Sequence, residues 1–239
     1  MNNFLKSIIG LVAIFVLSSQ TIVKDKLKIV AFGDSITARR STVDSVFAQR
    51  LPGLLADRGV ACEMIISGTG SSHSGKLTDN DFAKVKHGLD RFQTDVLDHK
   101  PDVVIIGFGA NDAYIDGDDP NGKSRISLSK YKENLVFMIE TLQANGVFVI
   151  LRTPPPFSFS EERMYLDKRL YGYVKVVRRL AKQYQTGLSD DYKLFKGYKG
   201  EDGGYGKLLP DGVHPNDLGH EMIANNVANV IVKYVKNGG

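Results

Sequence analysis

The chain has 239 residues, a length at which one α/β domain buries a substantial core. Its formal net charge at pH 7 is +4, and the basic residues are scattered among acidic ones rather than massed in a block. This charge pattern argues against nucleic acid as a partner. The single cysteine, Cys62, excludes an internal disulfide, and we expect it to be a small core residue in a strand.

The N-terminus has the pattern of an export signal. Lys6 precedes an apolar run over 8–17, and small or polar residues follow at 18–20. The run is shorter than the roughly 20 apolar residues that span a bilayer, and no cysteine follows it for a bacterial-type lipid anchor. We therefore interpret 1–20 as a secretory signal peptide and expect a secreted or periplasmic protein with no stable membrane span after cleavage. An uncleaved N-terminal membrane anchor is the alternative.

The remainder, 21–239, is expected to form one domain, because no repeat, low-complexity linker or change of composition divides it. Its pattern predicts strands and helices that largely alternate along the chain. Strands are expected over 28–32, 60–66, 102–107 and 147–151, and helices over 43–57, 131–145, 164–185 and 217–236. Alternation of this kind predicts a parallel sheet with helices on both faces.

Two short motifs near opposite ends of the domain carry groups for acyl transfer. A Gly-Asp-Ser motif at 33–35 directly follows the first predicted strand, and an Asp-Gly-Val-His-Pro motif at 211–215 precedes the last predicted helix. Asp211 and His214 are close enough for the carboxylate to orient the imidazole, which would leave its other nitrogen to face the Ser35 hydroxyl. Each motif alone is common in ordinary loops and turns.

Two further segments follow predicted strands. Gly-Phe-Gly-Ala-Asn-Asp at 107–112 comes after the apolar run 103–106, and the Asn111 side chain can donate an N–H. Ser-Gly-Thr-Gly-Ser at 67–71 comes after another apolar run, and its glycines allow close approach of backbone N–H groups to a ligand. Such segments are also ordinary turns. The coincidence of four complementary segments in an order compatible with one site favours an active site.

These segments resemble the four blocks of the SGNH hydrolases, also called the GDSL family of esterases and lipases. The blocks read FGDSIT at 32–37, SGTG at 67–70, GFGAND at 107–112 and DGVHP at 211–215. The resemblance extends over about 28–224. It implies a three-layer α/β/α sandwich with a central parallel sheet, in the flavodoxin-like arrangement of that family.

The resemblance also implies a role for each matched residue. Ser35 would be the nucleophile, His214 the general base and then general acid, and Asp211 the carboxylate that orients His214. The oxyanion hole would consist of the backbone N–H groups of Ser35 and Gly70 and the side-chain amide of Asn111. No metal or cofactor is required.

The second block departs from the family pattern, in which an Asn stands shortly before the glycine. Ser71 is therefore an alternative to Gly70 as the backbone donor.

Three other features have simpler interpretations than a binding site. The acidic stretch 116–122 resembles a calcium loop, but Pro120 occupies a ligand position and no Glu follows at the twelfth, so we expect a solvated loop that borders the substrate groove. His220, with Asp211 and His214, could form a metal site, but its predicted place on the last helix disfavours this. The Pro-Pro-Pro run at 154–156 is interpreted as a rigid exit from a strand.

The segments 125–131 and 153–156, with Asn134 and Leu135, resemble the subgroup that acts on small esters, including acetyl esters. Together with secretion, this predicts a small-molecule or carbohydrate ester as substrate. No long apolar lid is evident beyond the signal segment, and Trp is absent. A lysophospholipase or thioesterase acting on longer acyl chains is the alternative. A non-catalytic carbohydrate- or lipid-binding protein on the same fold is less expected, because none of the catalytic residues is missing. The oligomeric state is not determined by the sequence.

Overall fold

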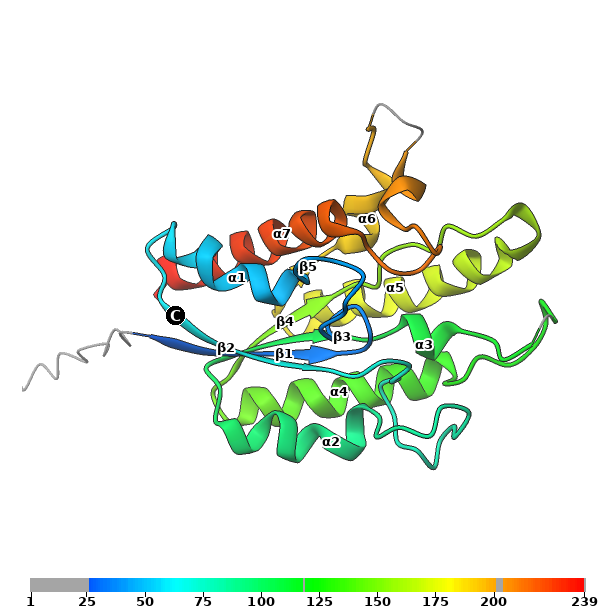
Figure 1. The fold of residues 1–239 in the computed structure, drawn as a ribbon. Coiled ribbons are helices and arrows are strands. Elements are labelled where there is room, and N and C mark those ends of the chain that lie inside the picture. The colour runs from blue at the N-terminus through cyan, green and yellow to red at the C-terminus, as the bar shows by residue number, and fades with distance from the viewer. Residues whose placement is uncertain (1–25, 118, 201–203, 239) are drawn as a thin grey trace, which may run out of the picture.

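The structure is a computed structural model that describes residues 26–117, 119–200 and 204–238. Within them, parallel strands form a five-stranded sheet in the order β2-β1-β3-β4-β5 (Figure 1). The strands are β1 (Leu27–Gly33), β2 (Cys62–Gly68), β3 (Val103–Gly107), β4 (Phe148–Arg152) and β5 (Gly187–Ser189). This is the flavodoxin-like strand order, in which ligands bind at the switch point between β1 and β3. The fold class implied by the sequence resemblance is therefore confirmed.

Helices cover both faces of the sheet, which gives three layers (Figure 1). On one face lie α1 (Phe47–Ala56) and α7 (Asp217–Lys236); on the other lie α2 (Gly88–Asp95), α4 (Leu128–Ala144) and α5 (Tyr165–Gln183). Shorter elements are α3 (Ala110–Ala113), α6 (Asp191–Lys196) and the 3-10 turns η1 (Leu97–His99), η2 (Glu161–Arg163) and η3 (Tyr205–Leu208).

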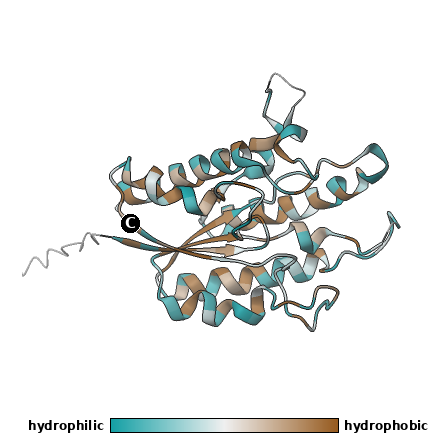
Figure 2. Cartoon of the chain, viewed as in Figure 1, coloured by the Kyte–Doolittle hydropathy of each residue, from teal (hydrophilic) through white to brown (hydrophobic). Residues whose placement is uncertain are grey.

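The core has two parts because side chains alternate across each strand. In β1, Val30 and Phe32 pack in the cluster with α2, α4 and α5, whereas Ile29 and Ala31 pack in the cluster with α1 and α7. All four are fully buried. Figure 2 shows the sheet as an almost continuous apolar layer between helices of mixed hydropathy. Burial on both faces explains why the inner strands are readable as apolar runs.

The observed elements differ from the predicted ones mainly at their ends. The helix expected from residue 43 begins at Phe47, because the backbone N–H groups of Asp44 and Ser45 donate to the Asp217 carboxylate instead of entering the helix. Cys62 is only partly buried, contrary to our expectation of a core residue, because β2 is an edge strand. The elements α2, α3, α6 and β5 were not predicted.

The predicted signal peptide at 1–20 lies outside the described residues. Among the residues that are described, none of the helices combines the length and apolar character needed to cross a membrane.

Candidate active site

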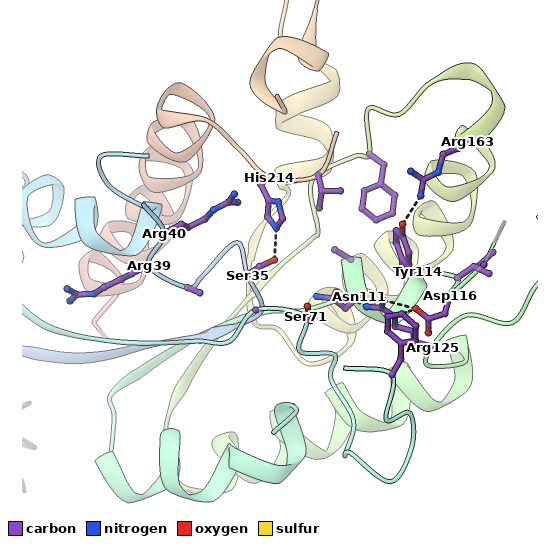
Figure 3. Close-up of a pocket in the computed structure, with 18 residues that line it drawn as sticks. Ser35, Arg39, Arg40, Ser71, Asn111, Tyr114, Asp116, Arg125, Arg163 and His214 are labelled. Atoms are coloured by element: carbon purple, nitrogen blue, oxygen red, sulfur yellow. Dashed lines mark hydrogen bonds and ion pairs between the residues drawn. The ribbon is translucent and has the colours of Figure 1, made fainter. Parts of the chain in front are cut away.

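The predicted site residues meet at the carboxyl edge of the sheet (Figure 3). Ser35 follows β1, Gly70 and Ser71 follow β2, and Asn111 follows β3, so three neighbouring strands deliver them to one place. His214 approaches from the loop before α7. All five line a cavity of about 790 Å³.

Ser35, His214 and Asp211 form a continuous chain of hydrogen bonds. Ser35 Oγ lies 2.9 Å from His214 Nε2, and His214 Nδ1 lies 2.7 Å from Asp211 Oδ2. With Nδ1 protonated and bound to the carboxylate, Nε2 is left as an acceptor for the serine proton. This geometry can activate a hydroxyl for attack on a carbonyl carbon.

The Asp211 carboxylate is held by the turn that carries His214. Its Oδ1 accepts hydrogen bonds from the backbone N–H groups of Val213 at 3.0 Å and His214 at 2.7 Å. Partial burial raises the pKa of Asp211, but these bonds and the His214 side chain outweigh it, so the pKa falls to about 2. The group is therefore ionised at neutral pH. Gly212 has φ +82°, in the left-handed region that favours glycine, and makes the turn possible.

The turn at Ser35 is organised by the preceding aspartate. Asp34 is buried, and its carboxylate accepts the Ile36 N–H at 3.0 Å while its own N–H donates to Gly107. Burial, only partly offset by the Ile36 hydrogen bond and by nearby Arg152, raises the pKa of Asp34 to about 6. The Ser35 N–H has no acceptor within the described part of the chain, so it is available to a ligand.

The backbone after β2 offers two candidate donors. Gly70 and Ser71 both line the cavity, and neither N–H donates to an acceptor within the described ranges. Ser71 has φ +59°, a conformation that is uncommon for a residue other than glycine and that clusters at functional sites. The choice between Gly70 and Ser71 stays open. Gly68, in contrast, is packed so closely that an added Cβ would lie 2.1 Å from the Ala38 nitrogen.

Asn111 lies on the short helix α3, which begins directly after Gly109. Its Nδ2 donates to the Ser72 carbonyl at 3.1 Å, and its Oδ1 accepts from Arg125 Nη1 at 3.1 Å. The amide carries two N–H bonds, so one is left for a ligand in the cavity.

The rest of the cavity wall mixes aromatic and charged side chains. Phe82, Tyr114 and Phe157 line it, and Phe82 is 65% exposed. The acidic loop at 116–122 borders this cavity through Asp116 and Gly117. The Asp116 carboxylate is occupied by Arg125, at 2.7 Å.

His220 lies on α7 as predicted, fully buried, with Nδ1 accepting the Phe47 N–H at 3.2 Å. It is therefore engaged with α1 rather than with Asp211 and His214. Among the described residues, no group of three or more His, Cys, Asp or Glu side chains is placed to hold a metal ion.

Sequence reasoning missed two arginines at the site. Arg40 Nη2 lies 4.0 Å from Asp211 Oδ2, with its side chain 18% exposed, and Arg125 contacts Asn111. Arg125 belongs to the segment 125–131, which in the sequence indicated only a resemblance to the subgroup that acts on small esters. An arginine in a loop carries no signal by itself, because its partner is fixed only by the fold.

A hydroxyl, imidazole and carboxylate aligned at the carboxyl edge of a parallel sheet, with N–H donors around them, are the features of a hydrolase of the α/β/α class. The model of the GDSL-like Lipase/Acylhydrolase family matches residues 31–222. The chain belongs to this family, and the resemblance seen in the sequence is confirmed.

The family and one curated relative, an arylesterase, support an ester-hydrolysing enzyme. An arylesterase of Vibrio mimicus is 28% identical, over 95% of this chain and 98% of its own. The uncharacterized lipoprotein YqeF of Bacillus subtilis (strain 168) is 30% identical, over 83% of this chain and 87% of its own. A lipase/acylhydrolase structure from Enterococcus faecalis has TM-score 0.66 and 30% identity, covering 88% and 96%. An acetylxylan esterase structure from Geobacillus stearothermophilus shares the fold, with TM-score 0.66 and 22% identity. The match covers 86% of this chain and 94% of that one.

Proposed function

We propose that this protein is a secreted serine esterase that removes short acyl groups, acetyl above all, from carbohydrate esters. The observation that carries the proposal is the hydrogen-bonded chain from Ser35 Oγ through His214 to Asp211. It opens to a cavity lined by backbone N–H groups that have no acceptor among the described residues. The enzyme class rests on the family, whereas the roles of individual residues and the substrate are our proposals.

In the proposed reaction, Ser35 Oγ attacks the ester carbonyl carbon and its proton passes to His214 Nε2. Asp211 holds the imidazole and stabilises the imidazolium that forms. The tetrahedral oxyanion accepts N–H bonds from Ser35, from Gly70 or Ser71, and from Asn111. Collapse breaks the bond to the alcohol, which takes the proton from His214 and leaves an acyl-serine. Water, deprotonated by His214, then releases the carboxylic acid and restores Ser35.

The cavity wall supports a small acyl group on a polar alcohol. Exposed Phe82 and the neighbouring Tyr114 present aromatic surface beside arginine side chains, a combination suited to a ring that is both polar and flat-faced. The acetylxylan esterase that shares the fold acts, by its name, on an acetylated polysaccharide. Both points favour an acetylated carbohydrate over a long acyl chain.

Export across a membrane is the second part of the proposal. It rests on the apolar segment 8–17 and the small residues after it, and it agrees with the name of the lipoprotein relative. We expect the N-terminal sequence of the protein recovered outside the cytoplasm to begin near residue 21. Recovery of the full chain in the membrane fraction would instead support the uncleaved anchor.

A chain-length series tests the substrate. With 4-nitrophenyl esters from acetate to decanoate, and with an acetylated xylooligosaccharide, we expect kcat/KM to be highest for acetyl groups and unaffected by EDTA. A kcat/KM that climbs steadily to decanoate would favour a lysophospholipase or thioesterase. Binding of carbohydrate or lipid without turnover of any ester would favour the non-catalytic alternative.

A further inference from the structure

Arg125 is held in the cavity wall by contacts of its guanidinium group with four side chains. Its Nε and Nη2 each lie 2.7 Å from Asp116 Oδ1, and its Nη1 donates to Asn111 Oδ1 at 3.1 Å. The guanidinium carbon lies 4.9 Å from the centre of the Phe82 ring and 5.0 Å from that of Tyr114. The side chain is only 10% exposed. Figure 3 shows it beside Asp116 and Asn111.

We propose that Arg125 is a positioning residue, which orients the Asn111 amide so that one of its N–H bonds meets the oxyanion. The inference rests on the proposed function and adds a residue to it. Arginine carries only donors, so the amide oxygen must face it, and the Ser72 carbonyl accepts only, so the amide nitrogen must face that side. A reversed amide would set N–H against N–H and oxygen against oxygen.

The charge of Arg125 also acts through the same bond. When an oxyanion accepts the free Asn111 N–H, the amide becomes more polarised and its oxygen more negative. A cation bound to that oxygen stabilises the change, and hydrogen bonds of charged groups are roughly twice as strong as neutral ones. Because this gain appears mainly when the oxyanion forms, loss of Arg125 is expected to lower kcat rather than raise KM.

A second arginine provides a matched control. Arg169 of α5 holds the same loop, donating to Ser124 Oγ at 3.1 Å and to the Pro120 carbonyl at 3.0 Å. It does not line this cavity, and both of these hydrogen bonds go to the loop rather than to Asn111. If loss of Arg125 acted only by loosening the loop, Arg169→Ala should therefore lower activity to the same extent.

The first test compares Arg125→Met, Arg125→Lys and Arg169→Ala on an acetate ester. Methionine keeps an unbranched apolar stem between the two rings and removes the donors. We expect Arg125→Met to lower kcat by about 10–100-fold, less than the loss of a direct oxyanion donor, with KM within about threefold. Lysine should restore little, because a point charge cannot hold Asp116 and Asn111 at once. Arg169→Ala should match the wild type, and thermal unfolding should show that each variant is folded.

The second test is a double-mutant cycle with Asn111→Ala. If Arg125 acts through Asn111, adding Arg125→Met to Asn111→Ala should cost no further activity. The inference would be overturned if Arg125→Met lowered kcat equally in the wild-type and Asn111→Ala backgrounds, or if Arg125→Met kept the wild-type kcat. It would also be overturned if Arg169→Ala lost as much kcat as Arg125→Met. None of these outcomes would contradict the esterase proposal. A wild-type protein that turns over no ester would instead refute the proposed function itself.

Discussion

Ser35 Oγ and His214 Nε2 lie 2.9 Å apart, although the two residues come from loops at opposite ends of the domain. We expect Ser35→Ala and His214→Ala each to remove nearly all esterase activity, since each deletes one partner of a single proton-transfer pair. The double variant should be scarcely worse than either single variant, because residues that act as a unit are strongly non-additive. Steady-state kinetics on a 4-nitrophenyl acetate substrate, with circular dichroism to verify folding, would measure this.

A folded Ser35→Ala protein that keeps more than about a tenth of the wild-type kcat/KM would contradict the assignment. A less than tenfold drop in kcat/KM corresponds to a loss of under about 1.4 kcal/mol of transition-state stabilisation, which is too small for the removal of a nucleophile.

Asn111→Ala is expected to lower kcat by about 10²–10³-fold with little change in KM. The reason is that the free Asn111 N–H is proposed to bind the oxyanion, which exists only in the transition state and intermediates. Separate determination of kcat and KM decides the point. A rise in KM at unchanged kcat would show that Asn111 binds the substrate in its ground state.

Gly212→Ala tests the turn that presents His214. Alanine would have to adopt φ +82°, and its Cβ would lie 2.7 Å from the Phe159 ring, so the turn must shift and carry His214 away from Ser35. We expect at least a tenfold loss of kcat. Gly59→Ala is the matched control, with φ +76° but nothing within 4 Å of the added Cβ. It should cost some thermal stability and no activity; a similar loss of activity in both variants would refute the explanation.

His220→Asn is expected to flatten the dependence of stability on pH. His220 is buried where α7 meets α1, and its Nδ1 accepts the otherwise unpaired Phe47 N–H at the start of α1. Burial, assisted by the nearby cations of Arg152, Arg40 and Arg50 and opposed by Asp217, lowers the pKa of His220 from 6.5 to about 3.

The sign of the effect follows from proton binding. Between pH 6.5 and about 3, the unfolded chain takes up a proton at His220 that the folded protein does not, so the free energy of unfolding falls as pH decreases. Asparagine keeps an acceptor near the Nδ1 position and does not titrate. Chemical denaturation at pH 7 and pH 5 should show a drop for the wild type that is larger than the variant's by roughly 1–2 kcal/mol. Equal drops would mean that His220 is protonated in the folded state.

The sequence determined the fold class and the main elements for identifiable reasons. The inner strands are buried on both faces, so each appears as a short apolar run, and α4, α5 and α7 are long enough to show helical periodicity. The last helix was predicted with its observed bounds, 217–236, and in the structure Asn216 caps it by accepting the Gly219 N–H. The short elements α2, α3, α6 and β5 were not predicted from the sequence, because so few residues carry little periodic signal.

The sequence also determined which residues to examine at the site. The serine, asparagine, aspartate and histidine motifs have specific residue types at fixed places after strands or before the last helix. Ser35, Asn111 and His214 line one cavity, and Asp211 is hydrogen-bonded to His214 behind it. It did not decide between Gly70 and Ser71, because the choice depends on which N–H the backbone directs at the ligand. Their distinction requires local backbone geometry, such as the left-handed conformation of Ser71.

Only the tertiary structure decided the partners of Arg40 and Arg125. Both are arginines in loops, a setting in which most side chains are simply solvated, and nothing local indicates that one lies beside Asp211 and the other binds Asn111. These contacts exist because the crossover helices bring the ends of β1 and β3 together, and with them the loops that precede α4 and α7. Residue type sets what a side chain can bind, but the path of the chain through space sets which partner it meets.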